Sequence, residues 1–161
     1  MFHSEDKIVN WQQAAEKVAS LQKEGKKVVF TNGCFDLVHL GHVDYLEKAR
    51  NLGDFLVVGI NTDKSVSVLK GPLRPVSSEK SRARVLASMG FIDLVVLFGE
   101  PTPKELIEEI KPDILTKGND YTVENIVGAD FVMGRGGKVE TLPLVEGYST
   151  TNLVNRMSGQ P

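Results

Sequence analysis

The chain has 161 residues, of which 41% are hydrophobic and 25% charged, and its formal net charge is −2. That size and composition predict a single globular domain, and the charge excludes a strongly basic surface of the kind that binds nucleic acid. A single cysteine excludes an internal disulfide, and no window has the apolar length of a membrane span. Residues 1–26 lack the apolar centre of a signal peptide. We therefore expect a cytoplasmic protein with no membrane and no nucleic-acid partner.

The N-terminal segment, residues 1–25, is predicted to be a helical extension packed on a domain formed by residues 26–161. Apolar residues recur at helical spacing between Ile8 and Lys23, and Gly25 follows them as a helix terminator. The pattern therefore predicts one helix over Ile8–Lys23.

The rest of the chain alternates between apolar segments, which predict buried strands, and amphipathic segments, which predict helices. The expected strands are Val28–Asn32, Phe55–Ile60, Leu94–Phe98, Asp113–Thr116 and Lys138–Leu142. The expected helices are Leu40–Leu52, Asn61–Val68, Ser78–Met89, Pro103–Ile110, Asn125–Met133 and Thr150–Met157, with a loop at Lys70–Ser77. This order predicts an α/β fold: a single-domain, Rossmann-like parallel sheet of about five strands with helices on both faces. Ligands of such sheets bind at the carboxyl ends of the strands.

Two of the three histidines, His39 and His42, open the helix that follows the first apolar strand. Their i, i+3 spacing places both imidazoles on one face of the helix start, where unpaired backbone N–H groups and the helix dipole favour anions. The pattern therefore predicts a polyphosphate site. Zinc is the alternative ligand, but it needs three or four protein ligands, and His3 and Cys34 do not complete a convincing set.

Three hydroxyl residues, Ser149, Thr150 and Thr151, start the last predicted helix. Taken alone, they are most often a helix cap. A second helix N-terminus that carries hydroxyl donors would also complement the first one as a phosphate cradle.

The segment Gly33-Cys34-Phe35-Asp36, followed by His39-Leu40-Gly41-His42, resembles the signature of the HxGH nucleotidyltransferase superfamily, which has the cytidylyltransferase-like fold. The resemblance extends from about Lys26 to the C-terminus and is closest to the heptose 1-phosphate adenylyltransferases of lipopolysaccharide-precursor synthesis. Further matches are Lys70-Gly71-Pro72-Leu73-Arg74-Pro75-Val76, Lys117-Gly118-Asn119-Asp120-Tyr121 and Ser149-Thr150-Thr151.

The resemblance implies a role for each of these motifs. It implies catalytic roles for His39, His42, Lys117 and Arg156. It implies nucleotide binding by Asn32, Gly33, Cys34, Phe35, His39, His42, Lys117, Gly118, Asp120, Tyr121, Ser149, Thr150 and Thr151. It implies acceptor binding by Asp36, Lys70, Arg74 and Arg82. No residue is expected to bind a metal directly, because Mg²⁺ is expected to bind through the phosphates of ATP.

The implied reaction is adenylyl transfer, with ATP and a sugar 1-phosphate as the small-molecule partners. D-glycero-β-D-manno-heptose 1-phosphate is the expected acceptor, and ADP-heptose and pyrophosphate are the expected products. A phosphate monoester is itself a nucleophile, so no activated Ser, Cys or Asp is required. A homodimer or a higher homo-oligomer is also expected.

Two alternative functions stay open at this stage. A glycerol 3-phosphate or ethanolamine phosphate cytidylyltransferase is the nearest one. The glycerol-phosphate enzymes carry an Arg-Thr-Glu-Gly run where this chain has Leu144-Val145-Glu146-Gly147, and the missing arginine argues against them. A nucleotide-binding module without turnover is the alternative of another class, and the intact pair of His39 and His42 argues against it.

Overall fold

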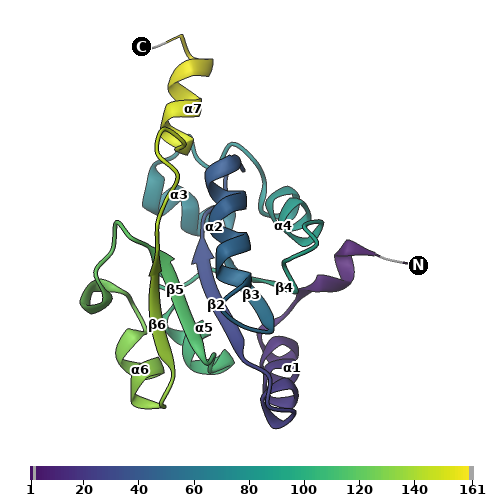
Figure 1. Cartoon of the computed structure of the whole chain (residues 1–161). Helices are drawn as coiled ribbons and strands as arrows, with labels where there is room; N and C mark the ends of the chain where they lie inside the picture. The colour runs from purple at the N-terminus through teal and green to yellow at the C-terminus, as the bar shows by residue number, and fades with distance from the viewer. Residues whose placement is uncertain (2, 160–161) are drawn as a thin grey trace.

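The structure is a computed structural model, and it describes residues 1 and 3–159. Within that part of the chain, six parallel strands form one sheet (Figure 1). The strands are β1 (Ile8–Val9), β2 (Val28–Gly33), β3 (Phe55–Asn61), β4 (Leu94–Phe98), β5 (Ile114–Gly118) and β6 (Lys138–Leu142). Their spatial order is β1-β4-β3-β2-β5-β6. The predicted α/β fold with a parallel sheet is confirmed, with one strand more than expected.

The helices connect successive strands and lie outside the sheet. The α-helices are α1 (Trp11–Lys23), α2 (Leu40–Arg50), α3 (Asp63–Lys70), α4 (Glu79–Ala87), α5 (Lys104–Ile110), α6 (Ala129–Gly134) and α7 (Thr150–Met157). Short 3₁₀ helices are η1 (Ser4–Lys7) and η2 (Val123–Asn125). None of the helices in the described residues is long and apolar enough to cross a membrane.

Alternate residues of each strand point to opposite faces of the sheet. Both faces are buried, because helices pack against each of them. Phe30 of β2 belongs to a core cluster that also contains Val18 of α1 and Leu106 of α5. Its neighbour Val29 belongs to a second cluster, which contains Leu46 of α2 and Leu86 of α4. Helices α1, α5 and α6 therefore cover one face, and α2 and α4 cover the other.

The predicted helix at Ile8–Lys23 is corrected at its start. Ile8 and Val9 pair in parallel with Val95 and Val96 of β4 and form the edge strand β1. Asn10 then caps α1, accepting a hydrogen bond from the backbone N–H of Gln13. A two-residue strand is too short to show a period in the sequence, which is why the pattern merged it with the helix.

The predicted helix at Asn125–Met133 is also corrected. The chain instead forms η2 and then α6, which begins only at Ala129. Gly128 separates them with a φ of +87°, in the left-handed region that breaks an α-helix.

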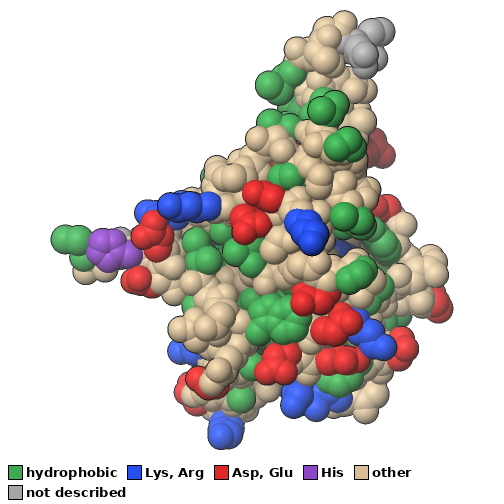
Figure 2. Space-filling model, turned by 180° about the vertical axis from the view of Figure 1, so that it is seen from behind, with side chains coloured by type: hydrophobic (Ala, Val, Ile, Leu, Met, Phe, Trp, Pro, Cys, Tyr) green, Lys and Arg blue, Asp and Glu red, His purple; other side chains and the backbone are tan. Residues whose placement is uncertain are grey.

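Helix α7 stands apart from the rest of the fold. It extends beyond the carboxyl ends of the strands (Figure 1), and none of its residues is buried. Figure 2 shows hydrophobic side chains along this projecting part of the molecule. The N-terminus of α7 is nevertheless close to the sheet, which brings Ser149, Thr150 and Thr151 to the site described next.

Candidate active site

A cleft of about 610 Å³ opens at the carboxyl ends of β2 and β5. The chain leaves β2 toward β3 on one side and later returns to β5 on the other, so the cleft lies at the switch point where parallel sheets bind ligands. The predicted site residues that line it are Asn32, Gly33, Cys34, Phe35, Asp36, His39, His42, Lys70, Arg74, Lys117, Gly118, Asp120, Tyr121, Ser149, Thr150 and Thr151. Only Arg82 and Arg156, among the predicted site residues, are not part of this lining.

The two histidines form a capping box at the start of α2. His39 is the N-cap, and its Nδ1 accepts a hydrogen bond from the backbone N–H of Gly41 at 3.1 Å. The backbone N–H of His39 donates to Nδ1 of His42 at 3.4 Å. Because Nδ1 of His39 is an acceptor, the proton of its neutral ring lies on Nε2, where it can donate to a ligand.

The rings of His39 and His42 are stacked, with centroids 3.9 Å apart and planes 27° apart. Burial, together with a smaller repulsion from His39, lowers the pKa of His42 to about 4, although a hydrogen bond with the backbone of Leu37 opposes this shift. Burial also lowers the pKa of His39. Both rings are therefore neutral near pH 7, and they can stabilise phosphate oxygens by donating hydrogen bonds rather than by carrying charge.

Gly41 is required between the histidines because of two close approaches. A Cβ at this position would lie 3.0 Å from Cε1 of His39 and 3.2 Å from Cβ of Tyr148. Both distances are tighter than ordinary van der Waals contact, so any side chain here would displace the ring of His39 or the segment that contains Tyr148.

Lys117 lies at the end of β5, and its ammonium group reaches across to β2. Nζ donates to the backbone carbonyl of Asn32 at 2.9 Å, and it lies 5.6 Å from the ring centroid of Tyr121. Burial lowers the pKa of Lys117 to about 8, although the nearby Cys34 and Asp120 oppose that shift. Lys117 is therefore the main positive charge at the inner end of the cleft, and it titrates just above neutral pH.

Cys34 lies between the cations of the cleft. Burial raises the pKa of its thiol, and the charges of Lys70, Arg82, Lys117 and Arg74 act against that rise. Its Sγ lies 3.7 Å from Oδ1 of Asn61. The thiol is thus a neutral group in a cleft whose nearby charged side chains are mostly cationic, as a site for phosphates requires.

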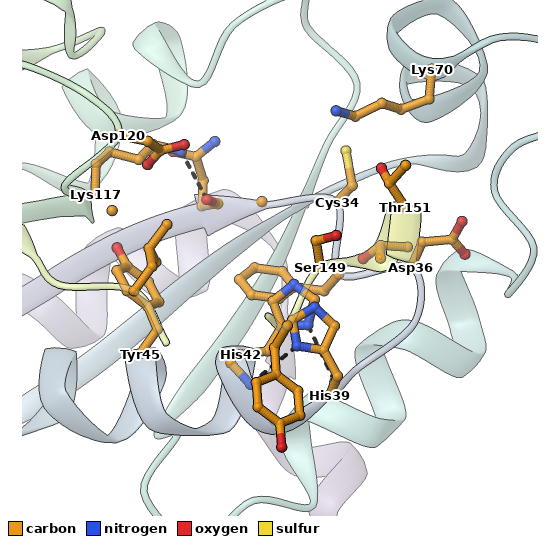
Figure 3. Close-up of a pocket in the computed structure, with 18 of the residues that line it drawn as sticks. Cys34, Asp36, His39, His42, Tyr45, Lys70, Lys117, Asp120, Ser149 and Thr151 are labelled. Atoms are coloured by element: carbon orange, nitrogen blue, oxygen red, sulfur yellow. Dashed lines mark hydrogen bonds between the residues drawn. The ribbon is translucent and has the colours of Figure 1, made fainter. Parts of the chain in front are cut away.

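Figure 3 shows how these groups are arranged. The imidazoles of His39 and His42 lie side by side, with Lys117 and Asp120 on the opposite side of the view from Lys70. The hydroxyl residues of the α7 start lie at the same cleft, and Ser149 caps α7 by accepting from the backbone N–H of Asn152 at 3.0 Å. Two helix N-termini, those of α2 and α7, thus meet at one cavity, as the two separate motifs predicted.

Asp36 lines the cleft, and its carboxylate is held by neighbouring protein groups. Its side chain is 1% exposed, and Oδ2 accepts from Nε of Arg74 at 2.6 Å and from the backbone N–H of Val76 at 2.9 Å. Oδ1 accepts from the backbone N–H of Ser77 at 2.8 Å. Burial by itself would raise the pKa of Asp36, but these hydrogen bonds and the Arg74 charge outweigh burial and lower it. Asp36 therefore anchors the loop that follows α3.

Arg82 does not occupy the place that its predicted contact with the acceptor requires. Its side chain is 1% exposed, and its guanidinium donates to the carbonyl of Cys34 at 2.7 Å, the carbonyl of Ser77 at 3.0 Å and the carboxylate of Asp63 at 2.8 Å. All three guanidinium nitrogens are therefore engaged by protein. Arg82 joins the β2–α2 loop to the loop before α4 instead of facing the cleft.

Arg156 also lies outside the cleft. It is exposed on the projecting α7, in the last turn of the helix, whereas the cleft is lined by residues at the first turn. The structure therefore does not support direct contact between Arg156 and a ligand in the cleft in this arrangement of α7.

Some lining residues were not predicted. Tyr45 donates to or accepts from Oγ1 of Thr31 at 2.8 Å, and burial raises its pKa to about 12. Its position three residues after His42, on the same helix face, is the signal that would have found it. Asn61, Leu144 and Tyr148 also line the cleft, but no spacing in the sequence connects them with the histidines.

A metal centre made of protein ligands is not supported. In the described part of the chain there is no group of three or more His, Cys, Asp or Glu side chains that could hold a metal ion.

Comparisons with known proteins agree with the fold. Residues 30–156 match the model of the cytidylyltransferase-like family. The chain is 56% identical over 159 residues to the bifunctional protein HldE of Magnetococcus marinus, a match that covers 99% of this chain and 33% of that protein. It is 58% identical over 154 residues to the bifunctional protein HldE of Gluconobacter oxydans, covering 96% of this chain and 32% of that protein. The chain thus spans about a third of the length of these curated relatives.

Two solved structures are similar as well. The lipopolysaccharide core biosynthesis protein from Thermoplasma volcanium matches with a TM-score of 0.59 and 29% identity, covering 78% of this chain and 100% of that chain. A pantoate-β-alanine ligase from Francisella tularensis matches with a TM-score of 0.65 and 18% identity, covering 94% of this chain and 76% of that chain. At that identity the second likeness shows the fold alone.

Proposed function

The chain belongs to the cytidylyltransferase-like family, and from that membership we propose that it transfers AMP from ATP to a sugar 1-phosphate, releasing pyrophosphate. The proposed acceptor is D-glycero-β-D-manno-heptose 1-phosphate and the product ADP-heptose, in the cytoplasm. The similarity to proteins named HldE and to a lipopolysaccharide core biosynthesis protein supports this choice. The observation that carries the proposal is the convergence of His39, His42 and Lys117 with the hydroxyl-bearing start of α7 at one cleft.

In this reaction the protein must position the acceptor phosphate and the α-phosphate of ATP. It must also stabilise the negative charge that is spread over the phosphate oxygens. An oxygen of the sugar phosphate attacks the α-phosphorus of ATP in line, and the bond from that phosphorus to the bridging oxygen of the β-phosphate breaks. His39 and His42 donate hydrogen bonds to oxygens around the reacting phosphorus. Lys117 supplies the positive charge, and Ser149, Thr150 and Thr151 hold the departing pyrophosphate. Preorganised donors of this kind each contribute about 10²–10³ in rate.

Magnesium fits this site as an ion carried by the nucleotide. Mg²⁺ usually keeps several waters and binds through substrate phosphates and one or two protein oxygens. The cleft offers such oxygens in the exposed carboxylate of Asp120 and in the buried Oδ1 of Asn32, which has no hydrogen-bond partner in the structure. These two residues would hold the hydrated ion, which neutralises charge on the phosphates when bound.

The acceptor is assigned to the side of the cleft formed by Lys70 and Arg74. Nε of Arg74 is used by Asp36, which fixes the direction of the guanidinium and leaves its outer nitrogens to face a phosphate. Lys70, the last residue of α3, adds a second cation. Because Asp36 and Arg82 both hold the loop that carries Arg74, they contribute to acceptor binding by positioning.

The decisive experiment tests the choice of nucleotide and the choice of acceptor in one panel of reactions. The purified protein is incubated with Mg²⁺ and ATP, CTP, GTP or UTP, each with heptose 1-phosphate, glycerol 3-phosphate or ethanolamine phosphate, and pyrophosphate and nucleotide-linked products are measured. The expected result is ADP-heptose from the ATP reaction. Predominant CDP-linked product would replace the proposal with a cytidylyltransferase, and no product with any pair would favour a binding module. Light scattering of the same sample measures the predicted homo-oligomer.

A further inference from the structure

Four aromatic rings from three parts of the chain lie in a row at the cleft. Phe35, in the β2–α2 loop, meets the ring of His42 edge-on at a centroid distance of 5.2 Å. The His42 ring stacks on His39 at 3.9 Å, and His39 is followed by Tyr148 at 6.4 Å with ring planes 28° apart. The two imidazoles are therefore enclosed between an aromatic ring that precedes α2 and one that precedes α7.

The backbone is built to let Tyr148 approach. Gly41 has no side chain, and a Cβ there would lie 3.2 Å from Cβ of Tyr148. Gly147 precedes Tyr148 with a φ of +82°, which only glycine adopts readily and which turns the chain into the α7 start. Tyr148 is 49% exposed, so only about half of its surface is covered by the rest of the chain.

His39 has few other restraints. Its Nδ1 accepts one hydrogen bond from Gly41, and one face of its ring is covered by His42. As the N-cap of α2, it lies outside the helix and lacks the packing that holds a residue in the helix interior. The ring of Tyr148, which is the second ring beside His39, would therefore limit how freely the imidazole turns.

We propose that Tyr148 is a positioning residue that holds the His39 imidazole in its phosphate-binding orientation. The expected effect of Tyr148 on turnover rests on the proposed function, whereas its effect on the orientation of the His39 ring does not. The segment that carries Tyr148 also carries Ser149, Thr150 and Thr151. The same segment thus delivers the hydroxyls to the pyrophosphate and sets the orientation of the histidine.

A direct contact with the nucleotide is the competing role for Tyr148. The near-parallel ring of His39 and the space left by Gly41 favour the positioning role. The observed contact with His39 is made by the ring of Tyr148 and not by its phenol hydroxyl. Phenylalanine at position 148 should therefore preserve this role, while leucine, which is apolar but has no ring, should not.

The test uses the variants Tyr148→Phe, Tyr148→Leu and Tyr148→Ala. Met157→Ala is the matched control, because Met157 is exposed on the same segment and does not line the cleft. The ring resonances of His39 are recorded by NMR in the free protein, since a neighbouring aromatic ring shifts them. They should move in the Leu and Ala variants and stay near the wild-type position in the Phe and Met157 variants. The Ala variant should lose roughly 2- to 10-fold in kcat, the size of one aromatic pair, with the KM for ATP changed by less than that factor.

Each other outcome has a defined meaning. His39 resonances that do not move in the folded Ala and Leu variants would overturn the proposal. So would a rise in the KM for ATP at unchanged kcat, because that result makes Tyr148 a nucleotide contact. If the wild-type protein makes no nucleotide-linked product but the resonances move as expected, the positioning role stands and the proposed function fails. Melting temperatures of all four variants show that each is folded.

Discussion

Raising the pH above 8 should remove the charge of Lys117 and thereby weaken the capture of ATP. Burial lowers the pKa of this lysine to about 8, so its charged form exists below that pH and is lost above it. A group with that pKa is about 91% charged at pH 7 and about 9% charged at pH 9. If only the charged form binds the polyphosphate productively, kcat/KM for ATP should fall about tenfold between these two pH values.

The assay is the initial rate of pyrophosphate release at ATP concentrations well below KM and a saturating acceptor concentration. Under these conditions the pH profile reports groups of the free enzyme. At saturating ATP the fall should shift to higher pH, because bound phosphates stabilise the charged lysine. Circular dichroism at each pH checks that the fold is kept.

Two variants test whether Lys117 is the group that titrates. Lys117→Arg keeps a charge at every pH used and should have no fall between pH 7 and 9. Lys117→Met should be flat as well, but lower by about 10²–10³ if the lysine acts as a preorganised donor. Lys104→Arg, at an exposed position, is the control and should match the wild type. A fall of equal size in the Arg and Met variants would show that another group titrates, and the role given to Lys117 would be wrong.

Three further predictions concern other parts of the site. His39→Ala or His42→Ala should lower kcat by about 10² or more with the melting temperature nearly unchanged, and a folded double variant with normal turnover would contradict their role. Arg74→Ala should raise the KM of the acceptor much more than that of ATP, whereas a change confined to ATP would assign this loop to the nucleotide. Arg82→Ala should lower the free energy of unfolding by roughly 2–4 kcal/mol, since it leaves two part-buried carbonyls without donors, and denaturant unfolding measures this loss. Unchanged stability would mean that water replaces the guanidinium.

Most of the sheet and the two helix starts at the cleft could be predicted, because they depend on local signals. A buried strand such as β2 begins with the apolar run Val28-Val29-Phe30, and the helix that follows it begins with residues whose chemistry can be read directly. The cleft then forms where the carboxyl ends of neighbouring parallel strands meet, which the alternation of strands and helices already implies. Sixteen of the eighteen predicted site residues line one cavity for this reason.

The parts that could not be predicted depend on contacts between distant segments. Arg82 was predicted to bind the acceptor, and only the fold shows that Cys34, Ser77 and Asp63 surround its guanidinium. Tyr148 lies more than 100 residues from His39, and no pattern in either segment indicates that their rings meet. Strand β1 has two residues, and it exists because β4 offers an unpaired edge. Local propensity contains no information about such partners.

The way the sheet ends on each side has a consequence for self-association. An unpaired edge strand can recruit a strand from another molecule, and proteins limit this with very short or charged edges. On one side, the two residues of β1 cover the middle of β4 with a strand too short to template further growth. On the other side, β6 exposes Lys138 and Glu140 along its length. A chain shortened to begin at Asn10 would uncover the apolar β4, and aggregation through added strands, rather than loss of the cleft, is the failure to expect from that truncation.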